Sequence, residues 1–536
     1  MGGTIACAKQ PKGDFQGIKR IEIPKLDADF IPENNFGIDA IKKYLPQILS
    51  AHKDNAEKEE QLYNYYLGEQ DIHQKERLYQ KDCANNNKIV ENHAFRQVNF
   101  KVGIITGEKR DYTYKVGSKG DDLKYLDYYF TDVDFFAKDK ELKEWIYATG
   151  IGVSFVTPRT DIIEPMGIDS VTGKQTFGYS KSYDVKTEAP FELSILDPKD
   201  NFVVYSSGRN KEPLFCVSIV EIDVGDKDTI DKRKELYIET RYANFKTTSN
   251  VGYGDIQDII RVNEKFLRYI PMVEHATNRS RLGIVELNYD LFNSVNTLIS
   301  SVADMIVDNA NVILVFKNTD ISSDEVLAMK QAGAIIINDA NSGATADLDT
   351  IKIEINYEGL NTYYEQRISQ MYDIAGVALA SGQATSGGDT GQARLLGGGW
   401  NNAYTMANND ITTLLKGDYL VLKQMLMICK QVPNNPVNEL SASQIDIKYR
   451  INQNDNFLVK AQGIAQLAGV NFPKEEIIKA SGLFSDTNTV AMKWKAEVEA
   501  ARKRNETGAV NGNIGKTNSP NAENAVVNET GNNSQE

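Results

Sequence analysis

The chain has 536 residues, beyond the size at which a single hydrophobic core keeps growing, so several domains are expected. Hydrophobic residues make up 41% and charged residues 25%, as in an average globular protein, which excludes a wholly disordered or fibrous chain. The 60 Lys and Arg against 74 Asp and Glu give a net charge of -14, which disfavours a protein that grips nucleic acid tightly and without sequence preference.

Cysteine content and hydropathy indicate the compartment in which the chain is expected to reside. The four cysteines are scattered without CxxC spacing, so they indicate neither a zinc knuckle nor a disulfide framework and favour a reducing compartment. No apolar run approaches the roughly 18 residues that cross a bilayer, and the N-terminus lacks the apolar core of a secretory signal. We therefore expect a chain that is neither secreted nor embedded in a membrane.

The first half of the chain predicts an α+β region. Three prolines interrupt residues 1–36, which we expect to form an extended arm over the surface. Apolar residues recur with helical spacing over 38–67, where Pro46 predicts a break, and over 88–107. Between positions 150 and 271, runs such as GIGVSFVTP, FELSIL and KELYIETRYAN alternate with Gly, Pro and Asp, which predicts strands joined by turns.

Residues 284–308 give the clearest helix prediction. They contain no Pro or Gly and would form a helix of about 38 Å at 1.5 Å per residue. One face is apolar, the opposite face is polar, and no Lys or Arg occurs between Arg281 and Lys317. The expected apolar face holds Ile284, Leu287, Leu291, Val295, Leu298, Val302 and Met305, and the expected polar face carries the carboxylates of Glu286, Asp290, Asp304 and Asp308.

A compact insertion and a returning helix follow. The insertion consists of NVILVF, a capping-box pattern from Ser322 to Glu325, the run AIII and the alternating run TIKIEIN, which together predict a small βαββ module. Apolar residues from Leu360 to Ala375 then predict a second helix. A charged stripe on a helix is usually only its solvated face, so the order of these elements is more informative than either helix alone.

A glycine-rich loop and a long helix come next. Residues 376–393 hold five glycines and a single charge, at Asp389, and loops of this length inside folded domains are usually functional or disordered. A helix is predicted over 394–429. We expect it to bend or break near its start, where Gly397, Gly398 and Gly399 stand together.

The C-terminal part changes character at about residue 504. A strand is predicted over 445–451, and three helices are predicted within 457–504. Residues 505–536 contain nine asparagines and no aromatic residue. They cannot bury enough surface to offset the entropy of ordering, so we expect a disordered tail.

No catalytic, cofactor or metal site is indicated. GNIGKT at 512–517 resembles part of a P-loop, but Val510 stands where the first glycine is required and no strand precedes it. The glycines of VGYGD at 251–255 lack the third glycine and the helix of a dinucleotide site and are expected in a turn between strands. Asp132 and Asp134 are better explained by a helix entry or a half-exposed strand than by metal binding.

Several segments resemble tailed-bacteriophage portal proteins, the head-tail connectors of siphophages and gene-transfer particles. The order and spacing of these segments between Tyr63 and Arg504 carry the resemblance. The segments are YNYYLGEQDI (63–72), NKIVENHAFRQVNFKVGIITG (87–107), WIYATGIGVSFV (145–156), ILDPKDNFVVY (195–205), TGQARLL (390–396) and IDIKYRINQNDN (445–456).

The resemblance implies a portal fold of the α+β class with named parts. These would be an N-terminal arm (1–36), a wing (37–270), a first stem helix (271–309), a βαββ clip (310–357), a second stem helix (358–375), a tunnel loop with its bent helix (376–432), a helical crown (437–504) and a disordered tail (505–536).

The resemblance also implies a function. Copies would form a ring, typically a dodecamer, at one capsid vertex, through which a separate terminase ATPase drives double-stranded DNA. The partners would be the terminase large subunit, the head-tail adaptor, the major capsid and scaffolding proteins, and DNA in transit. The protein would be made in the bacterial cytoplasm and reside at the portal vertex of the virion, with no cofactor, metal or membrane.

The resemblance assigns roles to three groups of residues. Carboxylates of the stem would repel phosphate and keep the channel wall slippery, a glycine-rich tunnel loop would touch DNA weakly, and a glycine hinge would bend the following helix. The stem group is Glu286, Asp290, Asp304 and Asp308; the loop group is Ser381, Gln383, Thr385, Ser386 and Asp389; the hinge is Gly397, Gly398 and Gly399.

Two other classes of protein remain as alternatives. One is another structural virion protein, such as a capsid or adaptor subunit. The other, less favoured, is a nucleic-acid-processing enzyme with scattered acidic metal ligands. Closed rings of the purified chain would support the portal, whereas monomers with metal-dependent nuclease activity would support the enzyme.

Overall fold

The structure, a computed structural model, describes most of the chain in segments. Contacts divide the chain into a main unit (1–115 and 120–453) and a C-terminal unit (116–119 and 454–536). The described residues are 17–75, 86–115, 122–159, 163–168, 175–179, 183–224, 231–265, 267–310, 313–317, 322, 324–325, 347–351, 356–379, 399–451, 462–467, 477, 490, 493–500 and 503.

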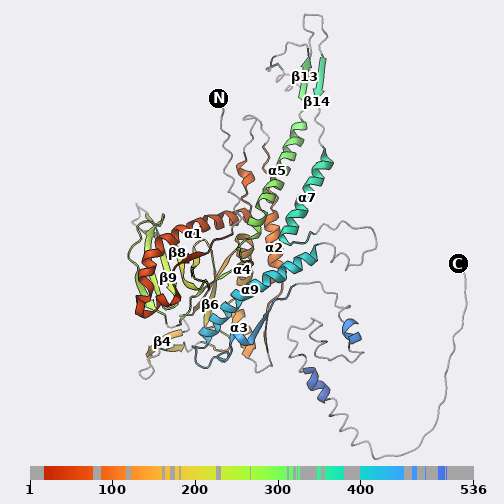
Figure 1. The fold of residues 1–536 in the computed structure, drawn as a ribbon. Coiled ribbons are helices and arrows are strands. Elements are labelled where there is room, and N and C mark those ends of the chain that lie inside the picture. Colours follow the sequence, from red (N-terminus) through yellow and green to blue (C-terminus); the bar gives the residue numbers. More distant parts are fainter. Residues whose placement is uncertain are drawn as a thin grey trace, which may run out of the picture. The chain divides into compact units, whose positions relative to one another are not determined.

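The main unit contains a six-stranded sheet covered by a long helix (Figure 1). Helix α1 (Ile38–Leu67) packs its apolar stripe, with Ile41 and Leu45, against the sheet residues Phe215 and Ile238. β1 pairs parallel with β7, and the other neighbours pair antiparallel. In spatial order the strands are β1 (Ile21–Ile23), β7 (Asn201–Ser206), β8 (Pro213–Val224), β9 (Asp231–Thr240), β10 (Ala243–Asn250) and β11 (Ile260–Glu264).

A second, three-stranded sheet carries the long helix α9 (Trp400–Cys429) on one side. Its antiparallel strands are, in order, β12 (Met272–His275), β3 (Gly152–Pro158) and β6 (Phe191–Leu196). The remaining elements are α2 (His93–Thr106), α3 (Asp122–Asp132), α4 (Phe135–Thr149), the strand pairs β2 (Asp111–Tyr114) with β15 (Ile445–Lys448) and β4 (Ile163–Ile168) with β5 (Gln175–Tyr179), and the 3-10 turns η1 (Asp27–Phe30), η2 (Pro32–Gly37), η3 (Asp71–Gln74) and η4 (Ala442–Gln444).

Two long helices, α5 (Ile284–Ala310) and α7 (Tyr357–Ala375), run antiparallel side by side (Figure 1). The chain between them includes β13 (Ile313–Lys317) and β14 (Asp347–Ile351), which pair antiparallel. At the other end of the pair, Phe292 and Val295 of α5 and Met371 and Tyr372 of α7 are buried in one core with α2 and α4. The helices are therefore anchored at one end and extend away from the core at the other.

Residues 17–36 are not the extended surface arm that the sequence predicts. They supply β1 and two 3-10 turns, and Ile23 and Phe30 are buried in the core beneath the sheet. The prolines lie between these short elements, where they interrupt periodicity without preventing burial. The expected arm can concern residues 1–16 alone, which lie outside the described residues.

Two predicted helices differ from the structure. Helix α1 has the predicted bounds but continues through Pro46 without the expected break, since apolar residues on both sides of the proline are buried. The predicted helix 88–107 begins only after Asn92, whose side chain accepts a hydrogen bond from the Phe95 N–H at 3.0 Å and caps α2. Residues 86–92 are instead irregular.

The strand and turn predictions hold in most places. KELYIETRYAN is divided between β9 and β10, with the turn at Arg241 and Tyr242. VGYGD forms the predicted turn between β10 and β11, where the Tyr253 N–H donates to the Asn250 carbonyl at 3.0 Å. Asp134 directly precedes α4, in agreement with the helix entry.

The predicted βαββ insertion is confirmed in part. Its first strand is present as β13, and the capping box is formed: the Ser322 N–H donates to Glu325 Oε2 at 2.9 Å and the Glu325 N–H to Ser322 Oγ at 3.4 Å. The strand that pairs with β13 is β14, which begins at Asp347, three residues before the predicted run TIKIEIN, and overlaps that run at Thr350 and Ile351. The rest of the insertion lies outside the described residues. Helix α7 begins three residues before the predicted Leu360 because Asn356 caps it, accepting from the Gly359 N–H at 2.9 Å.

The C-terminal unit is described in short pieces. Residues 462–467 and 493–500 are helical, within two of the three predicted helices. The predicted tail, 505–536, lies outside the described residues. Across the part of the chain that the structure describes, no helix combines the length and apolar character needed to cross a bilayer.

Candidate functional site

The polar stripe of α5 packs against the irregular segment that leads into α2. The Glu91 backbone N–H donates to Asn296 Oδ1 at 2.9 Å, and the Ile89 N–H donates to Ser300 Oγ at 3.0 Å. An irregular segment leaves backbone N–H groups without partners, and these side chains satisfy them. Much of the stripe is therefore an internal polar interface that fixes α5 to the rest of the main unit.

Two of the four predicted channel carboxylates belong to this interface. Glu286 is 5% exposed, lies 2.6 Å from Lys58 Nζ and accepts from the Gly17 N–H at 3.2 Å. Asp304 is 4% exposed and accepts from the backbone N–H and the side-chain amide of Asn87 at 2.8 and 2.9 Å. The prediction that both face solvent is wrong, because helical periodicity separates polar from apolar positions but does not distinguish water from a polar interface.

The third carboxylate keeps its predicted exposure. Asp290 is exposed and makes no ion pair with a described residue, and Thr297, two turns further on, is also exposed on the same face. The side chain of Asp308 lies outside the described residues, as do Ser381, Gln383, Thr385, Ser386, Asp389, Gly397 and Gly398. Of the predicted hinge, Gly399 is described: it precedes α9 with a left-handed φ of 79°, which favours glycine.

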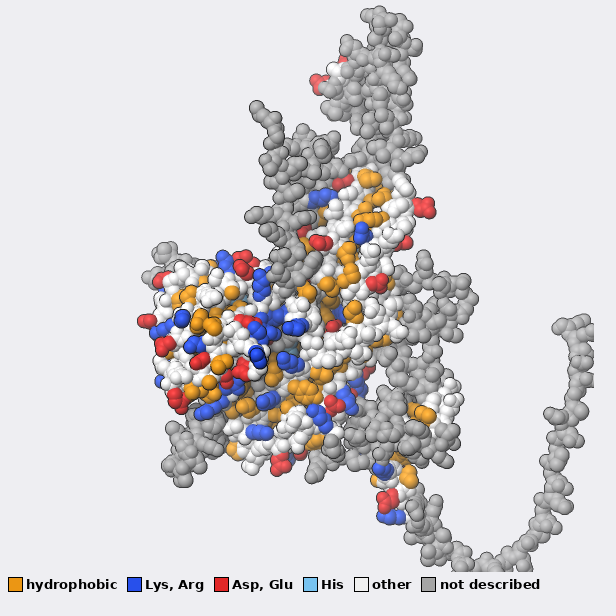
Figure 2. Space-filling view, viewed as in Figure 1, with side chains coloured by type: hydrophobic (Ala, Val, Ile, Leu, Met, Phe, Trp, Pro, Cys, Tyr) orange, Lys and Arg blue, Asp and Glu red, His pale blue; other side chains and the backbone are white. Residues whose placement is uncertain are grey.

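The protruding ends of α5 and α7 expose apolar side chains, beside the exposed carboxylate of Glu358. On the last turns of α5, Met305, Ile306 and Val307 are exposed, with Ile306 at 49%, and Tyr357 and Tyr363 are exposed on the first turns of α7. Figure 2 shows hydrophobic side chains along this helix pair. Two residues of the expected apolar face, Met305 and Leu287, are therefore exposed and not packed in the core; Leu287 is 40% exposed.

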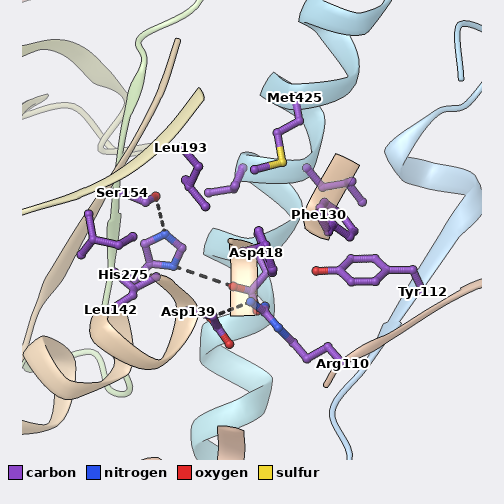
Figure 3. A pocket seen from close by; sticks show the side chains of 14 residues that line it. Arg110, Tyr112, Phe130, Asp139, Leu142, Ser154, Leu193, His275, Asp418 and Met425 are labelled. Carbon is purple, nitrogen blue, oxygen red and sulfur yellow. Dashed lines mark hydrogen bonds and ion pairs between the residues drawn. The ribbon is translucent and has the colours of Figure 1, made fainter. Parts of the chain in front are cut away.

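A buried cluster of charges connects α9 to the rest of the main unit (Figure 3). Arg110 bridges two carboxylates, with 2.6 Å to Asp139 of α4 and 2.8 Å to Asp418 of α9. Lys143 of α4 lies 3.2 Å from Asp139 and 3.7 Å from Asp418. The four side chains are at most 5% exposed, and their two positive and two negative charges balance.

Neutral groups complete the cluster. The Tyr449 hydroxyl donates to Asp418 Oδ2 at 2.5 Å. His275 of β12 lies between Asp418 and Ser154, with its Nε2 2.9 Å from Ser154 Oγ (Figure 3). Burial and the charge of Lys143 lower the pKa of His275 to about 3, so this histidine is neutral at pH 7.

The neighbouring positive charges keep Asp418 ionised. Burial alone would raise its pKa, but the charges of Arg110 and Lys143 outweigh burial and hold the pKa of Asp418 below its usual range. Gly417 allows the close approach of β12 to α9, because a Cβ at this position would lie 2.3 Å from His275 Nδ1. The adjacent cavity of about 20 Å³ holds a water molecule at most, so the cluster anchors a helix rather than binding a ligand.

Sequence reasoning did not find this cluster. Its members come from four separate elements, α4, α9, β12 and β3, and from two positions outside any helix or strand, and none belongs to a motif. The one signal is the pair of Gly417 and Asp418 within a mostly apolar stretch of helix. Within the described segments, no group of three or more His, Cys, Asp or Glu side chains could hold a metal ion.

The sequence matches the family "Phage portal protein, SPP1 Gp6-like" over residues 45–504. The protein is therefore a structural, non-enzymatic component of a phage-like virion, located at its portal vertex. The chain belongs to the phage portal protein family, as the resemblance predicts.

Solved structures give distant alignments. A chain from the neck of a native GTA particle, computed with C12 symmetry, aligns at 14% identity and a TM-score of 0.34, covering 73% of this chain and 89% of that one. A chain from the neck of an empty GTA particle, computed with C6 symmetry, aligns at 13% identity and a TM-score of 0.37, covering 73% and 90%. No curated protein sequence matches.

Proposed function

We propose that copies of this chain form a closed ring at one capsid vertex and that double-stranded DNA passes through its centre during packaging and ejection. Membership of the portal family supports a ring, and one observation on the chain itself carries the proposal. Met305 and Ile306 of α5 and Tyr357 of α7 give the protruding end of these helices an exposed apolar patch. Such a patch on a folded chain marks a surface that a partner covers, and in a ring the partner is the next copy.

The described elements support the division into parts with two changes. α5 and α7 would be the stem, the insertion with β13 and β14 the clip, and α9 the helix that follows the tunnel loop. The wing would begin at residue 17 rather than 37, because β1 belongs to its sheet. The crown would begin near residue 454 rather than 437, because β15 pairs with β2 inside the main unit.

The clip would be the docking surface for the terminase large subunit and later for the head-tail adaptor, since it interrupts two helices and extends beyond them. The wing and the outer surface of the ring would contact the major capsid and scaffolding proteins. Deleting residues 318–341 is expected to abolish DNA packaging while rings still form. Normal packaging by particles that carry this deletion would show that the clip is misassigned.

A second prediction concerns the channel wall. Asp290 is exposed on a helix that carries no Lys or Arg, so DNA phosphates would meet a surface that does not hold them. Asp290→Lys adds one cation per copy and is expected to slow packaging on the order of tenfold at low salt, through attraction to phosphate. Packaging rates of purified particles at low and high salt measure the effect.

Asp290→Asn is the matched control, because it removes the negative charge without adding a cation, and its packaging rate should remain close to that of the parent. Salt should also restore the Lys variant, since ions screen attraction between exposed charges. A well-formed Asp290→Lys ring that packages at the parent rate in low salt would rule out a repulsive wall at this position.

Truncation tests the C-terminal tail. Removing residues 508–536 is expected to leave ring assembly and the unfolding midpoint unchanged, because this asparagine-rich segment contains no aromatic residue to bury. Size-exclusion chromatography with light scattering would detect any loss of rings. Monomeric truncated protein would instead assign the tail a part in assembly.

A further inference from the structure

A cationic groove runs between the six-stranded sheet and α9. It has a volume of about 750 Å³. Its rim carries five exposed cations, none of which forms an ion pair with a described carboxylate, and Figure 2 shows Lys and Arg side chains gathered where the sheet meets the helices. The five are Arg20, Arg268, Arg279, Lys416 and Lys423.

The floor of the groove is apolar, with one buried guanidinium beneath it. Val203, Ile270 and Met272 line the floor, and Leu420 of α9 stands 44% exposed between the two rim lysines. Arg281 is 6% exposed, and its Nε has no hydrogen-bond partner among the described residues. Apolar contacts flanked by cations suit a protein segment with both apolar and acidic side chains, whereas a DNA backbone offers phosphate alone.

The turn between β10 and β11 has the complementary composition. Val251 is 45% exposed, and Asp255 and Asp258 are exposed without an ion pair to any described residue. Asn250 holds the turn in shape, since its Oδ1 accepts from the Gly254 N–H at 2.7 Å. A turn that is already ordered loses little conformational entropy when it docks.

The turn cannot reach the groove of its own chain. The groove borders the other end of the same sheet, at Arg241 in the turn between β9 and β10. β10 has eight residues. At about 3.3 Å per residue, the two ends are separated by roughly 26 Å. The acidic turn and the cationic groove can therefore meet only between copies, and two different surfaces that join head to tail close into rings.

We propose that the β10–β11 turn of one copy docks into the cationic groove of the next copy. This proposal rests on the ring of the proposed function and adds the contact that sets the direction around it. Asp255 and Asp258 would face Lys416 and Lys423, and Val251 would contact the exposed Leu420.

A charge-exchange experiment tests the contact. Lys416→Glu with Lys423→Glu is expected to lower the fraction of chains in rings at least tenfold, and Asp255→Lys with Asp258→Lys to do the same, because like charges then face each other. Combining all four substitutions should restore rings. Lys124→Glu with Lys140→Glu makes the same charge change on exposed lysines of α3 and α4, outside the groove, and should leave rings intact. Mass photometry gives the ring fraction.

The outcomes separate this proposal from the ring itself. Rings in the parent and in both charge-reversed pairs would overturn the docking contact and leave the ring standing. A parent that stays monomeric would overturn both. Binding of a fluorescent DNA duplex that is lost in Lys416→Glu with Lys423→Glu, while rings persist, would assign the groove to nucleic acid and overturn the docking contact.

Discussion

Asp418→Asn is expected to lower the free energy of unfolding of the main unit by about 3–5 kcal/mol, the usual cost of breaking a buried ion pair by removing one partner. The variant leaves Arg110 and Lys143 facing the single carboxylate of Asp139, so one positive charge stays buried without compensation. Helix α9 would detach from α4 and β12 first, because Asp418 is the member of the cluster that α9 contributes. Urea unfolding followed by near-ultraviolet circular dichroism, at equal protein concentrations, measures the loss.

Two controls isolate the charge balance. Adding Lys143→Met to Asp418→Asn removes the excess positive charge and should recover part of the lost stability. Breaking the exposed pair between Arg261 and Glu264, whose side chains are 46% and 63% exposed, should cost less than about 1 kcal/mol. An equal loss of unfolding free energy for the exposed and the buried pair would show that the buried cluster stabilises the fold no more than an exposed ion pair does.

The pH dependence of the cluster has a defined sign. The pKa of Asp418 is depressed in the folded chain, so its contribution is present at neutral pH and is lost as the pH falls below the usual aspartate range. The pKa of His275 is lowered to about 3 from 6.5, so acid also favours unfolding between these values, where only the unfolded histidine takes up a proton. The stability deficit of Asp418→Asn should therefore be the same at pH 8 and pH 7.

Ile306→Glu is expected to reduce ring formation at least tenfold while leaving the folded chain intact. The isoleucine is 49% exposed at the end of α5, so a glutamate is tolerated there in the isolated chain but would be buried as a charge in a ring. Burying an unpaired charge costs several kcal/mol at each interface of the ring. Mass photometry of the variant over a range of concentrations gives the change in assembly.

Thr297→Glu is the matched control on the same helix. Nine residues separate the two positions, which places Thr297 on the opposite face of α5, and it is exposed. The same charge there should leave rings intact, and circular dichroism should show equal helix content in both variants. If Ile306→Glu forms rings as the parent does, the apolar patch does not hold copies together.

The sequence predicts the elements of this protein better than their surroundings. The observed bounds of helices α1 and α5 agree with the sequence pattern nearly to the residue, because length and 3.6-residue periodicity are local properties. What α5 packs against depends on residues about two hundred positions away. Asp304 is a buried carboxylate that accepts a hydrogen bond from the backbone N–H of Asn87. No local pattern in the sequence reveals this distant contact.

The candidate site shows the same contrast between what local sequence patterns predict and what distant contacts determine. The resemblance identified the family through ordered short segments, and the match over residues 45–504 confirms it. The buried cluster of Arg110, Asp139, Lys143 and Asp418 escaped detection because each charge is unremarkable in its own segment and the fold alone brings them together. The charge balance of a buried cluster depends on which residues the fold brings together, so no spacing of residues along the sequence predicts it.

Electron microscopy of the purified full-length chain tests the central claim most directly. The account predicts closed rings with an open centre wide enough for a DNA duplex, in which copies contact each other through the apolar ends of α5 and α7. Class averages of such rings would also give the number of copies. The account would be contradicted if the chain formed only monomers, or open filaments without a central channel, at protein concentrations at which portal rings have to assemble.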